Sequence, residues 1–189
     1  MVGVIIMFNF FRKFFPKKAK KSLSISFEET FFKNIHHQWI KSDDRLNKIF
    51  IEFFQNIPNS VKAFFTAHPL LILKANKKFS CCLDIPSGYK VILVFPDLNQ
   101  RLNSVYYEDA LAILAHEIGH LYYQHSEKSI DPLEAQVAAD SFAAQLGHYK
   151  SLVKIIEEEA HGIEAKVRLV YLNSKYMFAD GQSGGGILN

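Results

Sequence analysis

Two histidines four residues apart, His116 and His120, have the spacing in this chain that points most clearly to chemistry. Glu117 follows the first, so the stretch reads His-Glu-Ile-Gly-His, the His-Glu-x-x-His pattern. Residues four apart on an α-helix lie on one face about one turn apart, so both imidazoles can bind one metal ion. Zinc favours nitrogen ligands and keeps an open position in catalytic sites. The pattern therefore predicts a Zn²⁺ site with Glu117 beside it as a general base.

A catalytic zinc ion usually has three protein ligands, so a third ligand must come from elsewhere in the chain. His125 lies five residues past His120, about 140° around the helix if it continues, and would face away from the ion. We interpret His125 as a cation at the helix end. Glu134 and Asp140 are six residues apart, so one straight helix cannot direct both at the same ion. Because Glu134 suits a capping box and an aspartate in mid-helix is locally disfavoured, we expect Asp140 as the third ligand and Glu134 as the fallback.

The stretch His-Glu-Ile-Gly-His followed by Ala-Asp-x-Phe-Ala resembles the gluzincin type of zinc metallopeptidase, in particular small bacterial and phage proteins of the ImmA/IrrE type and the minimal membrane-peptidase type. The resemblance covers about residues 90–146. Those families commonly show Glu-x-Glu-Ala-Asp, in which the first glutamate binds zinc and the aspartate orients a ligand histidine. Here Gln136 replaces the ligand glutamate and Ala138 the second acid. Either Asp140 binds zinc directly, with Gln136 beside it, or Asp140 orients a histidine while Glu134 or a water binds the ion.

The resemblance implies a zinc-dependent metallopeptidase that hydrolyses protein or peptide substrates by a zinc-activated water, with Glu117 as general base. In the resembling families an edge strand precedes the motif helix, so we expect residues 90–95 to pair with an extended peptide. The alternative is a catalytically inactive zinc-binding regulatory or protein-interaction module, which the replacement at Gln136 supports. Candidates for stabilising the oxyanion are Tyr123, His148, Tyr149, His161, Arg168 and Tyr171.

Apolar periodicity and turn residues place these groups on a mainly helical chain. We expect helices over 26–54, 60–67, 104–125, 131–146 and 150–176, and strands within 70–83 and over 90–95. Asp131 and Pro132 are typical of a helix start, and the alanines around Asp140 let a neighbouring helix come close. The expected fold is an α+β, mainly helical zincin-like domain over residues 26–178. It has a small sheet, and the His-Glu-x-x-His helix packs on a second metal-ligand helix.

The two ends of the chain differ in composition from this domain. Residues 1–25 form a basic, Phe-rich arm, and residues 179–189 form a Gly-rich tail that we expect to be disordered. The apolar stretch of the arm is too short to span a bilayer. We interpret the arm as a frayed or core-docked end, with peripheral membrane contact as the alternative. The remaining chain is close to neutral, which argues against a nucleic-acid partner. Only two cysteines occur, and they are adjacent, so a reducing, cytoplasmic location is expected.

Overall fold

A computed structural model describes residues 26–75, 81–84, 88–159 and 161–177, so the arm and the tail lie outside the described residues. The α-helices are α2 (Phe27–Lys33), α3 (Gln38–Lys41), α4 (Asp44–Gln55), α5 (Asn59–Ala67), α6 (Pro96–Leu102), α7 (Tyr107–Tyr123), α8 (Pro132–Ala143), α9 (Tyr149–Glu159) and α10 (Ile163–Tyr176). The strands are β1 (Leu70–Lys74), β2 (Cys81–Asp84) and β3 (Lys90–Val94). The expected α+β, mainly helical organisation is thus confirmed at this level. None of the described helices is long and apolar enough to cross a membrane.

The three strands form one mixed sheet in the order β1-β3-β2. β3 pairs with β1 in parallel, with Leu70 opposite Lys90, and with β2 in antiparallel fashion, with Cys81 opposite Leu93. Since both edges of β3 are paired, the prediction that residues 90–95 offer a free edge to a peptide is wrong. The apolar pattern predicted the strand β3 correctly, but the order of the strands in the sheet depends on tertiary contacts.

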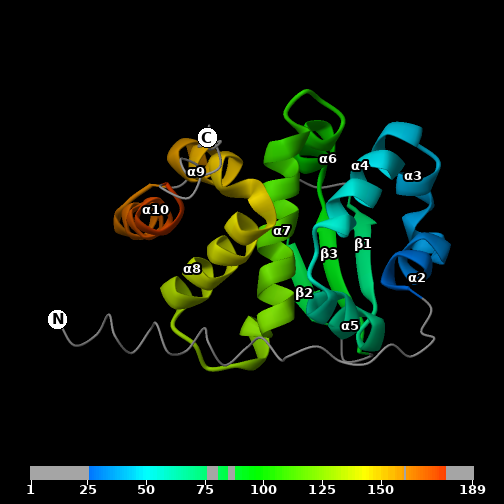
Figure 1. Cartoon of the computed structure of the whole chain (residues 1–189), viewed down its shortest axis with the longest axis horizontal. Coiled ribbons are helices and arrows are strands. Elements are labelled where there is room, and N and C mark those ends of the chain that lie inside the picture. Colours follow the sequence, from blue (N-terminus) through cyan, green and yellow to red (C-terminus); the bar gives the residue numbers. More distant parts are fainter. Residues whose placement is uncertain (1–25, 76–80, 85–87, 160, 178–189) are drawn as a thin grey trace, which may run out of the picture.

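Side chains of two residues close the outer edge of β1. The backbone N–H of Ile72 donates to His37 Nε2 at 3.1 Å, and Trp39 Nε1 donates to the carbonyl of Ile72 at 3.2 Å. No further strand pairs with β2 among the described residues. β2 lies beside α7, and within the described part of the chain its outer edge has no strand partner (Figure 1).

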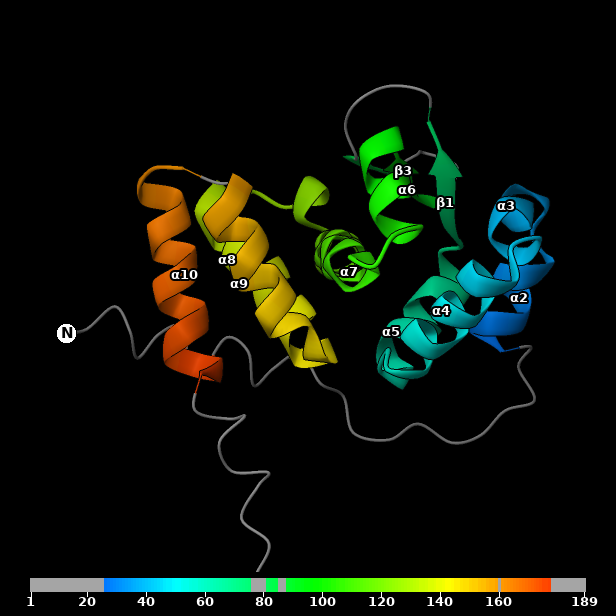
Figure 2. The same ribbon diagram turned by 90° about the horizontal axis from the view of Figure 1, so that it is seen from above.

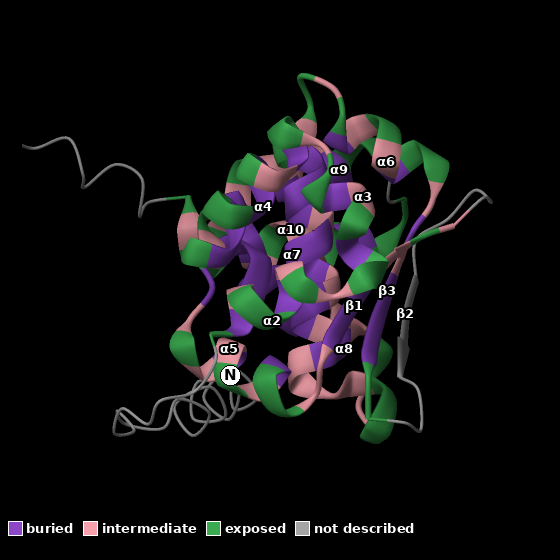
Figure 3. Cartoon of the chain, turned by 90° about the vertical axis from the view of Figure 1, so that its right-hand side faces the viewer, coloured by how far each residue is buried: buried purple, intermediate pink, exposed green. Residues whose placement is uncertain are grey.

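Helix α7 runs through the middle of the molecule, as two perpendicular views show (Figures 1 and 2). Helices α8, α9 and α10 lie on one side of it, and the sheet with α2 to α5 lies on the other. Ala112, Leu114, Ala115 and Ile118 of α7 are fully buried. Burial concentrates on this helix and its neighbours, whereas the outer turns are exposed (Figure 3). The motif helix is thus part of the hydrophobic core, and this position restrains the side chains that it carries.

The helices differ from expectation mainly where polar residues or glycine interrupt a long apolar pattern. The region 26–54 divides because Asn34 and Asp43 cap new helical turns with their side chains. The last helix divides into α9 and α10 at Gly162, which has φ of 96°. Pro96, directly after the expected strand 90–95, occupies the first turn of α6, where its missing N–H costs nothing.

Candidate metal centre

A close contact between α7 and α8 brings the expected site residues together. An added Cβ on Gly119 would lie 3.0 Å from Phe142 Cβ and 3.2 Å from Ala139 Cα, so only glycine allows this approach. Asp131 caps α8 through its side chain, and Pro132 is the first helical residue, as predicted. The expectation that the alanines of this helix admit a close neighbour is confirmed.

The imidazoles of His116 and His120 face each other through their Nε2 atoms, which are 3.0 Å apart. Two nitrogen ligands of a tetrahedral zinc ion lie about 3.3 Å apart when each bond is about 2.0–2.1 Å. A small adjustment of either ring would therefore give the separation that a shared metal ion requires. The two imidazoles thus lie on one face of α7, as the spacing predicted.

The other ring nitrogen of His116 points to Asp140, which is fully buried in α8. His116 Nδ1 lies 2.8 Å from Asp140 Oδ1, close enough for a hydrogen bond although the ring is not aligned for an ideal one. Arg168 of α10 binds the same carboxylate with two atoms, Nε to Oδ2 at 2.7 Å and Nη2 to Oδ1 at 2.8 Å. Asp140 is thus occupied on the Nδ1 side of His116, away from the converging Nε2 atoms.

The other ring nitrogen of His120 meets His125, with 2.8 Å between the two Nδ1 atoms. The prediction that His125 faces away is wrong, because the helix does not continue to it. Gln124 adopts the left-handed conformation, with φ of 57° and ψ of 46°, and ends α7. This turn folds His125 back onto the last turn of the helix. One nitrogen of the pair must donate and the other accept, and a metal ion on His120 Nε2 would make His120 the donor.

Burial keeps His120 and His125 neutral. Desolvation, with the nearby His116 and His125 rings, lowers the pKa of His120 from 6.5 to about 3. Desolvation likewise lowers the pKa of His125 to about 4. Burial opposes ionisation of Asp140, but hydrogen bonds from Arg168 and His116 outweigh it and lower the pKa of this carboxyl. His120 therefore keeps a lone pair with which it can bind a metal, and the carboxylate of Asp140 is held nearby by Arg168.

None of the other predicted site residues in the described part of the chain joins His116 and His120 as a third metal ligand. Glu117 is partly exposed and makes no hydrogen bond or ion pair within the described part of the chain. Glu134 is exposed in the first turn of α8, where its N–H donates to Asp131. Gln136 is partly buried one turn before Asp140. Among the described residues, no three His, Cys, Asp or Glu side chains are grouped to hold a metal ion.

The oxyanion candidates are widely separated. His148 lies near the start of α7, with Nδ1 3.8 Å from Glu108, and Tyr149 donates to Asn173. Tyr123 stacks near His125, at 5.6 Å between ring centroids, and burial raises its pKa to about 12. A tyrosine that keeps its proton is a hydrogen-bond donor, so Tyr123 is the neutral donor among these candidates that lies beside the histidines. His161 is exposed, and Tyr171 contacts Lys175.

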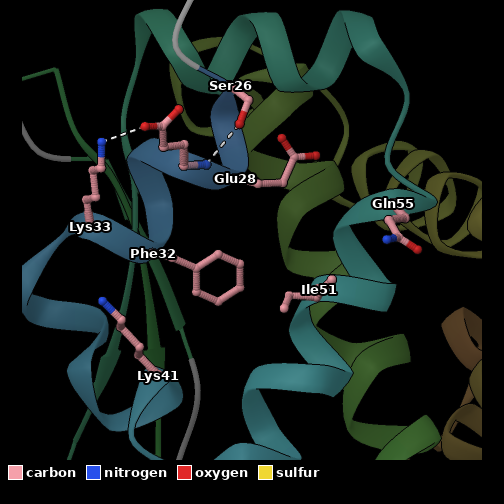
Figure 4. A pocket seen from close by; sticks show the side chains of 8 residues that line it. Ser26, Glu28, Phe32, Lys33, Lys41, Ile51 and Gln55 are labelled. Atoms are coloured by element: carbon pink, nitrogen blue, oxygen red, sulfur yellow. Dashed lines mark hydrogen bonds and ion pairs between the residues drawn. The ribbon is translucent and has the colours of Figure 1, made fainter.

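A separate surface hollow of about 490 Å³ lies on α2, α3 and α4. Phe32 and Ile51 give it apolar walls, and Lys33 and Lys41 lie at its rim (Figure 4). Lys33 forms an ion pair with Glu29, one turn earlier in the same helix. These helices and α8 are on opposite sides of α7, so the hollow is not part of the histidine centre (Figure 2).

In comparisons with known proteins, the sequence matches no family model, and no curated protein and no solved structure matches the chain. The interpretation of the centre therefore depends on its own residues and geometry.

Proposed function

We propose that the chain is a zinc-dependent metallopeptidase in which His116 and His120 bind the ion through Nε2. One observation carries the proposal. The two Nε2 atoms face each other at 3.0 Å, while His120 Nδ1 meets His125 Nδ1 and His116 Nδ1 lies 2.8 Å from Asp140 Oδ1. Ligand histidines in metalloproteins typically donate their second ring nitrogen to such a partner, which fixes the tautomer and the ring orientation. Two imidazole nitrogens are also a donor set that suits zinc.

In this proposal Asp140 orients His116 and is not itself a ligand. Its two oxygens are engaged by Arg168 and by His116 Nδ1, so binding the ion would require breaking a buried ion pair. Glu134 would have to move from an exposed position. We therefore infer that water fills the remaining coordination positions, as the orienting alternative allows.

Glu117 has the role of general base. It is one residue along the helix from His116 and is not tied into an ion pair among the described residues, so its carboxylate is free to accept a proton from water and pass it to the leaving amine. When bound, the ion would supply polarisation of the scissile carbonyl and a lower pKa for the attacking water. The edge of β2 beside α7, and not β3, would take the extended substrate by backbone pairing.

The Glu117→Gln variant distinguishes an enzyme from a catalytically inactive zinc-binding protein. The amide keeps the size of the side chain but cannot accept the proton, so zinc content should stay near the wild-type level. Hydrolysis of a peptide library should fall by a factor of about 10²–10⁴ or more. Mass spectrometry of the library and elemental analysis of the protein are the two measurements.

The matched controls use histidine. His116→Ala should remove stoichiometric zinc, whereas His161→Ala, an exposed histidine away from the centre, should not. Equal cleavage by wild type and Glu117→Gln would refute the general base. Unchanged zinc in His116→Ala would refute the metal site.

The second candidate function is a catalytically inactive zinc-binding regulatory or protein-interaction module. The grouping of only two convergent ligands among the described residues, with Gln136 in place of a glutamate, favours it. In that case wild type and Glu117→Gln would both hold zinc, and neither would cleave any peptide. Introducing the glutamate with Gln136→Glu should then raise zinc affinity, because a carboxylate is a better zinc ligand than an amide.

A further inference from the structure

The short turn η2 (His125–Glu127) carries His125 back to the end of α7, but the hydrophobic core does not hold it there. None of the three residues of this turn is buried. Gln124, the residue before it, has φ of 57°, and this left-handed conformation costs free energy in a residue other than glycine. Polar contacts must therefore stabilise the turn in this position.

An ion pair joins η2 to the sheet. Lys90 is the first residue of β3, and its Nζ donates to Glu127 Oε1 at 2.7 Å. The side chain of Lys90 is only 4% exposed, whereas that of Glu127 is 47% exposed. A buried ammonium group needs such partners, and Glu127 is one of those that Lys90 has. Because water hardly reaches Lys90, the pair is less screened than an ion pair between two exposed side chains.

The route from this ion pair to His120 is short. The backbone N–H of Glu127 donates to the carbonyl of Gln124 at 3.0 Å, which closes the turn. His125 lies two residues before Glu127 in the same turn, and its Nδ1 is 2.8 Å from His120 Nδ1. Releasing Glu127 from Lys90 would therefore free the turn and change the contact between the two rings.

The other histidine of the centre has a similar arrangement. Asp140 lies 2.8 Å from His116 Nδ1, and Arg168 of α10 binds the Asp140 carboxylate with two atoms. The two cations come from opposite sides of α7, since α10 lies on one side and the sheet that contains Lys90 on the other (Figure 2). Each layer that packs on the motif helix thus holds the partner of one histidine.

We propose that Lys90 and Glu127 are positioning residues of the metal centre, because their ion pair holds η2 where His125 can orient His120. This inference rests on the proposed zinc site. It extends that site to the first residue of β3, so that the sheet supports the geometry of a ligand on α7.

Zinc affinity, measured by competition with a chromogenic chelator, is the first test. Glu127→Ala should lower the affinity by roughly 3–10-fold, since it acts one step beyond an orienting partner, whose loss costs about 10–100-fold. Glu127→Gln keeps an oxygen that accepts from Lys90 and should retain most of the affinity. The matched control is Glu28→Ala, which removes the ion pair between Glu28 of α2 and Lys62 of α5 and should leave zinc affinity unchanged.

A double-mutant cycle tests the route through His125. In His125→Ala there is no ring to place, so adding Glu127→Ala should change zinc affinity by less than about 2-fold. Lys90→Met should weaken binding as much as Glu127→Ala, and the two together should weaken it no further. Circular dichroism of each variant confirms that the fold is kept. Independent, multiplicative effects of His125→Ala and Glu127→Ala overturn the proposal, and so does wild-type affinity in Glu127→Ala.

NMR of the metal-free chain gives a test that does not depend on the proposed function. The contact between the two Nδ1 atoms determines which nitrogen of each ring carries the proton, and the imidazole nitrogen chemical shifts report it. Glu127→Ala should change these shifts for His120 and His125, whereas Glu28→Ala should not. A wild type that holds no zinc refutes the proposed metal site, and the shifts then decide the positioning role alone. Unchanged shifts in Glu127→Ala overturn that role.

Discussion

At the scale of the residue, the centre is organised by the second nitrogen of each histidine. His125 is the clearest case, since its Nδ1 is 2.8 Å from that of His120 and it lies at the surface end of the helix. For the proposed zinc site, we predict that His125→Ala lowers zinc affinity by about 10–100-fold, the usual effect of losing a partner that orients a ligand, with little change in melting temperature. Competition with a chromogenic chelator measures the affinity, and His161→Ala is the control. Equal affinity for wild type and His125→Ala would contradict the role.

The pair of Arg168 and Asp140 also belongs to the residue scale. Arg168→Met would leave a fully buried carboxylate without its cation, and we expect it to lower the free energy of unfolding by about 3–5 kcal/mol. Asp140→Asn in the same chain should recover part of this loss. A double-mutant cycle by urea unfolding of the metal-free protein should give a coupling energy above about 1 kcal/mol. Additive effects would show that the two side chains do not act as a pair.

At the scale of the element, Gly119 decides how closely α7 and α8 approach. Alanine in a helix is normally more favourable than glycine by up to about 1 kcal/mol. Here the added methyl would lie 3.0 Å from Phe142 Cβ, so Gly119→Ala should lower the free energy of unfolding by about 1–3 kcal/mol. In the proposed metal centre, zinc affinity should fall as well, because Asp140 on α8 would move relative to His116. Thermal and urea unfolding check the sign, and a stabilised variant would contradict the close approach.

At the scale of the whole molecule, one buried and two half-buried histidines make stability depend on pH. Burial lowers the pKa of His37 to about 4, and those of His120 and His125 are lowered to about 3 and 4. In the unfolded chain these groups take up protons from about pH 6.5, so the unfolded state binds more protons as the pH falls. The free energy of unfolding should be at its highest and nearly constant above pH 6.5. It should decrease as the pH falls towards 4, and His37 alone should account for up to about 3 kcal/mol of this decrease.

Urea unfolding of the metal-free chain at several values between pH 7.5 and 4.5 measures this decline. His37→Gln should lower stability at pH 7.5, because Ile72 loses a buried acceptor, and should flatten the decline. Constant stability of wild type from pH 7 to pH 5 would contradict the depressed pKa values.

Local patterns in the sequence determined most of the helices and the relative position of His116 and His120. The spacing of His116 and His120 brings both rings to one face because helix geometry alone relates residues four apart. Asp131 and Pro132 likewise specify a helix start through their own side chains and the backbone that follows. These predictions hold because the interactions behind them span a single turn.

Contacts between distant segments decided the rest, and no local pattern contains them. The expected strand region 70–83 forms two strands, β1 and β2, and these pair with opposite edges of β3. Arg168 reaches Asp140 across 28 residues of chain. His125 returns to His120 only because Gln124, which is not a glycine, takes the left-handed conformation. Each of these depends on packing energies that a residue acquires from its neighbours in space, and therefore only the folded chain reveals them.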